Sequence, residues 1–360
     1  HYSGGKNMVG KKIQFALTAL VLLAVMLGAC GTAATPTPEV IIETVEVPVE
    51  VPVTQPTAAP VDPLVACEGS TMAYLGFGSQ FAFIAIVDES MQRAAAEYGV
   101  NLLFIDNEFS PEKALENAEL VAARDDVDLV FEFNYYQQQN YVIADIFKEA
   151  GIPVVAIDIP IPGAVYYGGD NYYAGKIAGI GLGEWAAKQW GDEPVDLVLV
   201  EQQSLAGQQT LEARTLGIIA GVYQSMPYLT EDQVVRFEGE NNPDAAGEAV
   251  AAQLTAHPDA QRVLIGMLGD SNAIAALNQA IELGKDVGAS GIGGDDVGIQ
   301  SLRTGDPPGF VGTSLFLPEH YGDDLIPLGC RILAGEQVPA EVFVQHVFLT
   351  KDNLDEYYPE

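Results

Sequence analysis

The sequence predicts an α/β protein with two doubly wound lobes, each built on a parallel sheet. Its 360 residues, 48% of them hydrophobic, are enough for two domains. From Thr71 onward, short apolar runs alternate with amphipathic helical patterns. This alternation is typical of right-handed β-α-β units and parallel sheets. The expected strands form two groups that divide near Asp170.

The composition is strongly acidic, with 50 Asp and Glu against 16 Lys and Arg and a formal net charge of -34. Such a polyanion is repelled by nucleic acids and by anionic lipid surfaces. We therefore expect no nucleic-acid partner. The three cysteines and four histidines lack the spacing of a zinc site, and no P-loop or nucleophile elbow is present. The sequence thus indicates a protein that is not an enzyme and has no metal and no cofactor.

The N-terminal segment has the pattern of an export signal. Lys11 and Lys12 precede an apolar run that stops at Cys30, and Met8 is the expected initiator. Residues 27–30, LGAC, resemble the bacterial lipobox, in which the cysteine carries the lipid. We therefore interpret 8–30 as a lipoprotein signal peptide with lipidation at Cys30, anchoring the protein to the outer face of the cell membrane. The alternatives are an ordinary secretory signal and an uncleaved anchor.

Residues 31–66 are rich in Pro, Thr and Val and contain the near-repeat VEVPVEVPV. Recurrent prolines favour an extended chain and prevent a packed core. This stretch is predicted to be a disordered linker.

The globular part contains nine expected strands before its final helix. They lie at 72–77, 101–105, 128–133, 152–157, 196–200, 233–237, 262–267, 287–293 and 310–315. Helical patterns lie between them, at 89–97, 111–123, 141–150, 172–189, 209–224, 243–255 and 273–283. Ser110, Asn242 and the pair Asp270-Ser271 are suitable N-caps. After Phe316 we expect a helix ending at Gly335 and a closing strand at 342–349.

The strand at 152–157 is apolar on both faces and ends at Asp158. Open α/β sheets bind their ligands at the carboxyl ends of the strands. Asp158 is therefore a candidate binding residue, although an Asp at this place can also serve as a helix cap or form a turn.

Two cysteines flank the globular part. Cys67 lies just before the first strand and Cys330 lies in the last expected helix. In an oxidising compartment they can form a disulfide that closes a very long loop. Two buried free thiols are the alternative.

Six segments in order resemble the type I periplasmic sugar-binding proteins, the ribose/galactose-binding family. They are GIPVVAID (151–158), GGDNYYAGKIAG (168–179), EARTLGI around Arg214, AHPDAQRVL (256–264), GIGGDD (291–296) and KDN (351–353). The resemblance covers nearly everything from Thr71 to the C-terminus. It implies two lobes joined by three crossovers that close on a ligand. Lobe 1 would comprise 67–170 plus 317–345 and lobe 2 would comprise 171–316 plus 346–360, which brings Cys330 towards Cys67.

The resemblance also implies three charged ligand contacts. Asp158 matches the acid after the fourth strand, Arg214 matches the binding arginine, and Asp295 matches the second acid. Acids accept hydrogen bonds from sugar hydroxyls and a guanidinium donates to them. Arg214 could instead be a surface residue paired with Glu212 or Glu201, and Asp295 stands beside Asp296, which could be the helix cap.

Six further residues are candidates with weaker support. Phe81 and Phe83 fall where the family places its stacking rings, although phenylalanines are more often core residues. Asn134 and Tyr135, with Tyr136, follow the third strand, where a polar turn is the alternative. Phe316 lies where the family carries a polar residue near the hinge, and Asp270 follows the strand at 262–267. We expect Trp185 and Trp190 to contribute to packing.

Two departures from the family bear on the ligand. Ile159 stands where the family has an arginine, and Gly269 stands where it has an asparagine. With the added Tyr135, Tyr136 and Phe316, these changes suggest a less polar or bulkier ligand than ribose.

Together these features predict an extracytoplasmic, monomeric binding protein that captures a neutral sugar-like solute by lobe closure and delivers it to an ATP-driven (ABC) permease. One alternative is presentation of the ligand to a chemoreceptor or sensor kinase. Another is a nucleotide-dependent α/β enzyme, although the glycines do not complete G-x-G-x-x-G. A sugar-responsive transcription regulator has the same fold, but here an export signal replaces a DNA-binding segment.

Overall fold

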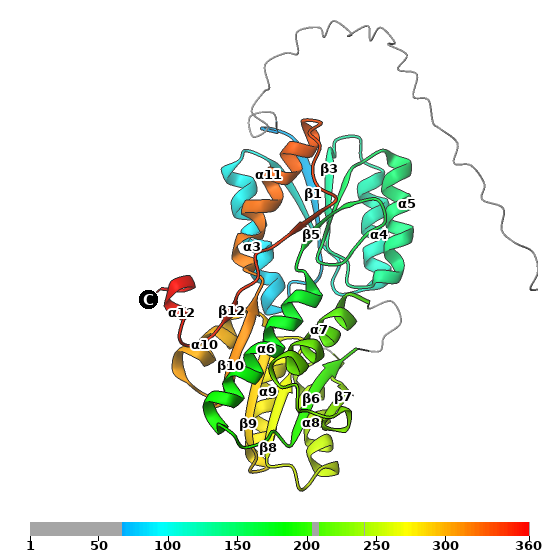
Figure 1. Ribbon diagram of the computed structural model, residues 1–360. Coiled ribbons are helices and arrows are strands. Elements are labelled where there is room, and N and C mark those ends of the chain that lie inside the picture. The colour runs from blue at the N-terminus through cyan, green and yellow to red at the C-terminus, as the bar shows by residue number, and fades with distance from the viewer. Residues whose placement is uncertain (1–66, 204–208, 241, 360) are drawn as a thin grey trace, which may run out of the picture. The chain divides into compact units, whose positions relative to one another are not determined.

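The computed structural model describes residues 67–203, 209–240 and 242–359, which all belong to one compact unit. The predicted signal peptide at 8–30, the linker at 31–66 and Cys30 lie outside these residues. Within them, two six-stranded sheets with helices on both faces form two lobes (Figure 1). We call the lobe with the first strand lobe 1 and the other lobe 2.

The sheet of lobe 1 has the strand order β11-β5-β4-β3-β1-β2, with all neighbours parallel. Its strands are β1 (Thr71–Gly76), β2 (Asn101–Asp106), β3 (Leu129–Glu132), β4 (Val154–Ile157), β5 (Val165–Gly168) and β11 (Glu341–Phe343). Helices α3 (Ala82–Glu97) and α11 (Tyr321–Leu333) cover one face, while α4 (Pro111–Ala122) and α5 (Asn140–Ala150) cover the other (Figure 1). Because both faces are covered, the central strands are mostly apolar, with Glu132 on β3 as an exception.

Lobe 2 repeats this plan with the order β12-β10-β9-β8-β6-β7. Its strands are β6 (Leu197–Gln202), β7 (Val234–Glu238), β8 (Arg262–Gly266), β9 (Asp286–Gly293), β10 (Phe310–Leu315) and β12 (Phe348–Leu349), the last antiparallel to β10. Its helices are α6 (Asn171–Trp190), α7 (Gln209–Ser225), α8 (Pro243–Ala256), α9 (Asp270–Glu282), α10 (Asp296–Thr304) and α12 (Leu354–Tyr357). Short 3-10 turns are η1 (Gln137–Gln139), η2 (Glu231–Gln233) and η3 (Pro318–His320).

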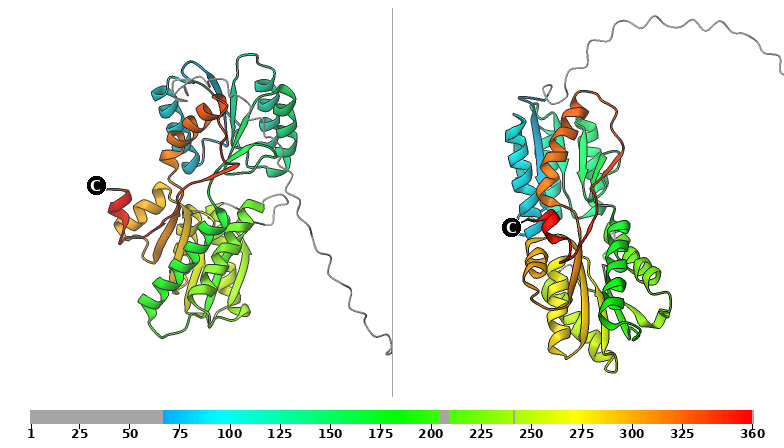
Figure 2. Two further views of the ribbon diagram at one scale, coloured as in Figure 1. Left: turned by 45° about the horizontal axis from the view of Figure 1, so that its top comes forward. Right: turned by 60° about the vertical axis from the view of Figure 1, so that its left-hand side comes forward.

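The chain passes between the two sheets three times. The connections follow β5, β10 and β11, and they run side by side between the lobes (Figures 1 and 2). In each lobe the strand order reverses next to the first strand, which is the point where open α/β sheets bind ligands. The carboxyl ends of both sheets therefore face the junction of the lobes.

The structure confirms the α/β class and the two doubly wound lobes, but it differs from the predicted elements in several places. Strand β5 was not predicted. Helix α3 begins at Ala82 rather than at residue 89. The single strand predicted at 342–349 is two short strands, because Val344 to Val347 cross from one sheet to the other. The N-cap of α9 is Gly269 rather than Asp270 or Ser271, whereas Ser110 and Asn242 do cap α4 and α8.

Cys67 and Cys330 form a disulfide, with 5.1 Å between their Cα atoms. It links the start of lobe 1 to α11. Both residues are fully buried in the lobe 1 core, so the bond is protected from solvent.

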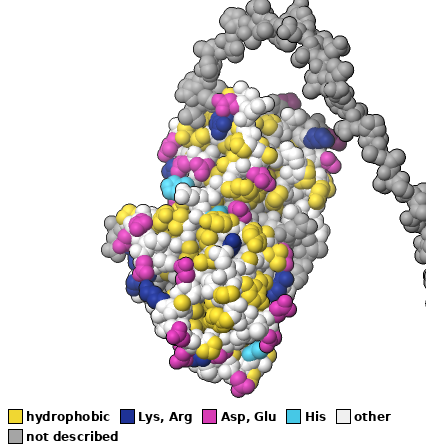
Figure 3. Space-filling view, in the orientation of Figure 1, with side chains coloured by type: hydrophobic (Ala, Val, Ile, Leu, Met, Phe, Trp, Pro, Cys, Tyr) yellow, Lys and Arg dark blue, Asp and Glu magenta, His cyan; other side chains and the backbone are white. Residues whose placement is uncertain are grey.

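The acidic side chains are spread over both lobes on the face shown in Figure 3. Among the described residues, no helix is both long and apolar enough to cross a membrane.

Helices α6 and α7 pack with their backbones in direct contact. A Cβ atom on Gly179 would fall on the carbonyl oxygen of Ile218, and one on Gly221 would fall on the carbonyl oxygen of Lys176. Only glycine allows this approach. The pairing matters for the site because α6 starts with Asn171 and α7 carries Arg214.

We expect Gly179→Ala to lower the free energy of unfolding by about 1–3 kcal/mol, since the extra methyl group forces the two helices apart. Gly247→Ala in α8 is the matched control. There the nearest atom is the flexible Gln279 Cγ, at 3.2 Å, and the higher helix propensity of alanine adds up to about 1 kcal/mol. Urea unfolding of both variants measures the difference. Equal effects at the two positions would contradict the close contact.

In lobe 1, strand β3 carries a buried acid. Glu132 is fully buried, and its Oε1 accepts a hydrogen bond of 3.0 Å from Asn107 Nδ2. Its Oε2 has no hydrogen-bond partner among the described residues. Burial raises the pKa of Glu132 to about 8, and the Asn107 hydrogen bond opposes this only in part.

Because the folded protein keeps a proton here that the unfolded chain releases near pH 4.5, stability should fall as the pH rises towards 8. Glu132→Gln removes this contribution. We expect the wild type to lose stability relative to the variant by up to roughly 1 kcal/mol per pH unit between pH 5 and 8. Unfolding free energies at pH 5, 6, 7 and 8 test this expectation. Parallel curves would refute it.

Candidate functional site

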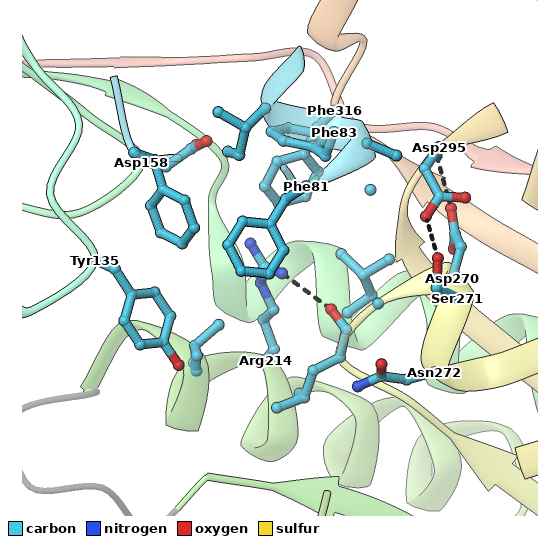
Figure 4. Close-up of a pocket in the computed structure, with 18 of the residues that line it drawn as sticks. Phe81, Phe83, Tyr135, Asp158, Arg214, Asp270, Ser271, Asn272, Asp295 and Phe316 are labelled. Carbon is cyan, nitrogen blue, oxygen red and sulfur yellow. Dashed lines mark hydrogen bonds between the residues drawn. The ribbon is translucent and has the colours of Figure 1, made fainter. Parts of the chain in front are cut away.

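A cavity of about 390 Å³ lies where the carboxyl ends of the two sheets face each other (Figure 4). Lobe 1 contributes residues that follow β1, β3 and β4, and lobe 2 contributes residues from α7 and from the segments after β7, β8 and β9. The cavity contains eight of the nine predicted ligand residues: Asp158, Arg214, Asp295, Phe81, Phe83, Tyr135, Phe316 and Asp270.

Asp158 lies directly after β4, with a backbone φ of 56° in the left-handed region. Its Oδ1 accepts hydrogen bonds from Gly169 N at 3.1 Å and from the Tyr321 hydroxyl at 3.0 Å. Burial raises the pKa of Asp158 to about 6, while the charge of Arg214 acts in the opposite direction. Asp158 therefore joins the first lobe connection to α11 while it also lines the cavity.

Arg214 projects from α7 into the centre of the cavity (Figure 4). Its Nε donates to Asn171 Oδ1 at 2.6 Å, and its Nη1 donates to the carbonyl oxygen of Leu268 at 3.0 Å. The guanidinium carbon lies 4.8 Å from the ring centre of Phe316, a cation–π contact. Burial lowers the pKa of Arg214, and the negative charge of Asp158 opposes this shift.

Arg214 is not a surface residue paired with Glu212 or Glu201, which was the alternative expectation. Glu212 pairs with Arg236 instead, with 2.5 Å between the charged atoms. Glu201 is fully buried and accepts hydrogen bonds from Leu268 N and Asn272 Nδ2, both at 2.8 Å.

Two acids of lobe 2 form a connected pair at the opposite end of the cavity from Tyr135 (Figure 4). Asp295, not Asp296, is the N-cap of α10, because its Oδ1 accepts from Gly298 N at 2.9 Å. Its Oδ2 accepts from the Ser271 hydroxyl at 3.0 Å. Asp270 Oδ2 accepts from the backbone N–H groups of Gly294 and Asp295. Burial and the charge of Asp295 raise the pKa of Asp270 to about 8.

The aromatic candidates surround the cavity. Phe83 packs edge-on against Phe316 and Tyr321, with ring centres 6.2 and 5.9 Å apart. The hydroxyl of Tyr135 donates to Gln203 Oε1 at 2.6 Å. Tyr135 belongs to lobe 1 and Gln203 to lobe 2, so this bond directly joins the lobes.

Asn134 is the exception among the predicted residues. It is buried, but it is not among the described residues that line the cavity. Its Nδ2 donates to Asn140 Oδ1 at 2.8 Å, which turns the side chain towards the start of α5. Trp185 and Trp190 pack against each other, with ring centres 5.1 Å apart.

Sequence reasoning missed several lining residues, among them Phe77, Gln80, Leu211, Asn242, Ser271 and Asn272. Phe77, Ser271 and Asn272 follow β1 and β8 closely, so a consistent search of strand ends would have found them. Asn171 was also missed. It does not line the cavity, but it orients Arg214. In the part of the chain that the structure describes, no group of three or more His, Cys, Asp or Glu side chains could hold a metal ion.

Comparison with known proteins agrees with this architecture. A model of the periplasmic binding protein domain matches residues 73–337. A ribose import binding protein of Haemophilus influenzae is 23% identical over 263 residues, which cover 72% of this chain and 84% of the relative.

Two solved structures show the same fold. A Mycobacterium smegmatis protein in complex with β-D-fucofuranose has a TM-score of 0.69 at 21% identity, over 81% of this chain and 95% of its own. A glucose-galactose binding protein from Geobacillus stearothermophilus has a TM-score of 0.64 at 20% identity, over 80% and 99%. Because the domain model spans most of the chain, this protein belongs to the periplasmic binding protein family, with the type I arrangement of two lobes.

Proposed function

We propose that this protein captures a neutral sugar-like solute outside the cytoplasm and presents it to an ABC permease in the membrane. The observation that carries the proposal is one cavity to which lobe 1 contributes a buried acid and lobe 2 a partly buried guanidinium, with aromatic rings between them. Two of the similar proteins support it, since one is a ribose import binding protein and the other is a glucose-galactose binding protein.

The chemistry of the cavity suits hydroxyl groups. The carboxylates of Asp158 and Asp295 have lone pairs beyond those used within the protein, and Nη2 of Arg214 can donate. Charge-assisted hydrogen bonds of this kind contribute about 1.5–3 kcal/mol each. The rings of Phe81, Phe83 and Phe316 can cover the apolar C–H faces of a sugar.

Ligand capture would proceed by lobe closure. A ligand that contacts both lobes stabilises the closed form and shifts a pre-existing equilibrium towards it. The hydrogen bond between Tyr135 and Gln203 would act in the same direction, because it forms only when the lobes approach each other.

The proposal places the protein, as a monomer, on the outer face of the cell membrane, anchored by lipid at Cys30. The buried disulfide supports this location, since such bonds persist in oxidising compartments. The lobe boundaries proposed from the sequence, 67–170 plus 317–345 and 171–316 plus 346–360, are kept as part of this proposal.

We expect Asp158→Asn to weaken sugar binding by about tenfold or more, because the charged acceptor is lost while the amide can still bond to Gly169 and Tyr321. A thermal-shift panel of pentoses, hexoses, disaccharides, polyols and phenyl glycosides identifies a ligand, and calorimetry then measures its affinity. Asp145→Asn, at an exposed position of α5, is the control. If no compound in the panel raises the melting temperature, the proposed function is wrong.

We further expect Tyr135→Phe and Gln203→Ala each to lower ligand affinity by roughly threefold to tenfold, and the double variant to lose no more than one of them alone. Such non-additivity measures the bond between the lobes rather than separate ligand contacts. Tyr141→Phe, on an exposed tyrosine of α5, is the control. Additive losses would exclude Tyr135 and Gln203 as a closing contact.

A further inference from the structure

We infer that the ligand is a glycoside, a sugar that carries an apolar substituent, with its hydroxyls bound by the polar groups of lobe 2 and by Asp158, and with the substituent packed against the aromatic rings of lobe 1. This inference rests on the proposed function and specifies its substrate class. It follows from an unequal division of polar and apolar groups between the two walls of the cavity (Figure 4).

The wall formed by lobe 1 is mainly aromatic. Phe77, Phe81, Phe109, Phe133, Tyr135 and Tyr136 form a connected group with ring centres 5.0–5.5 Å apart, which we call the aromatic cluster. Four of its members, Phe77, Phe81, Phe133 and Tyr135, line the cavity. Flat rings at fixed angles offer a large apolar contact area without loss of side-chain freedom on binding.

The polar groups of lobe 1 are few and largely engaged. Asp158 accepts hydrogen bonds from Gly169 and Tyr321. Asn134 turns away to Asn140. Ile159, next to Asp158, presents an apolar side chain to the cavity. Apart from Asp158 and Gln80, the described lobe 1 residues along the cavity bring no charged or amide side chain.

The wall formed by lobe 2 carries more polar side chains, beside the apolar Leu211, Pro243, Leu268 and Ile292. Arg214, Asn242, Ser271, Asn272 and Asp295 all line it. Arg214 and Asp295 are held in place by their own hydrogen bonds, so they are oriented before a ligand arrives. A hydroxylated ring can satisfy these groups along one edge.

A bare monosaccharide fits this division poorly. It has hydroxyls around its whole ring, and those facing the aromatic cluster would lose water without gaining partners. The cavity of about 390 Å³ also falls within the range of sites that enclose drug-sized ligands, about 300–1,000 Å³. An apolar substituent would fill the lobe 1 side, and each buried methylene-sized group adds about fourfold to affinity.

The test compares matched pairs on the full-length chain by calorimetry. The probes are D-glucose, D-galactose and D-xylose and the phenyl β-glycoside of each. We expect at least one phenyl glycoside to bind about tenfold or more tightly than its parent sugar. If free sugars bind as tightly as their phenyl glycosides, the inference is overturned while the proposed function stands. If none of the sugars or glycosides binds, the proposed function fails and the inference fails with it.

Two variants of the lobe 1 wall test whether the apolar substituent packs there. Phe81→Ala, which removes a half-buried ring of the aromatic cluster, should weaken binding of the phenyl glycoside more than binding of the parent sugar, so that the preference falls to about threefold or less. Ile159→Asn alters the same wall without removing a ring and should act in the same direction. Tyr141→Ala, at an exposed site in lobe 1, is the control. An unchanged preference in both cavity variants would refute the assignment of the substituent to lobe 1.

Discussion

The partly buried guanidinium of Arg214 constrains the rest of this molecule. A charge removed from water needs partners, and these come from parts of the chain that are distant in sequence. Asn171 at the start of α6, the backbone of Leu268 after β8 and the ring of Phe316 at the second lobe connection all contact it. Its hydrogen bond to Asn171 joins α7 to the start of α6, where the two helices are in backbone contact. The chemistry of the cavity and the geometry of the junction therefore depend on the same contacts.

Burying carboxyl groups costs free energy, which other interactions in the two lobes must offset. Asp158, Asp270 and Glu132 all have a raised pKa because they lie away from water. Around the cavity, burial also favours ligand binding, because a hydrogen-bond acceptor held away from water binds a hydroxyl more strongly than an acceptor in water. The large apolar cores on both faces of each sheet compensate for the free-energy cost of burying these acids. Glu132, which does not line the cavity, shows that the same cost also arises in the core of lobe 1.

Much of the fold was predictable, because apolar runs of strand length and capped helices repeat along the chain. Asp158 was predictable for the same reason, since it ends a buried strand. Strand β5 was not, because its four residues follow a loop that contains two prolines and a glycine. The division of 342–349 depends on which sheet each half joins, and periodicity does not contain that information. Asn134 has a suitable residue type at a strand end, but its partner Asn140 determines where the amide points.

The disulfide has a mechanical consequence. Cys67 is the first residue that the structure describes, and its sulfur is bonded to α11 directly before β1 begins. A force applied to the chain ahead of Cys67 is shared between β1 and α11, so it cannot peel the first strand from its sheet alone. The pulling load therefore enters lobe 1 through two elements that pack on the same core.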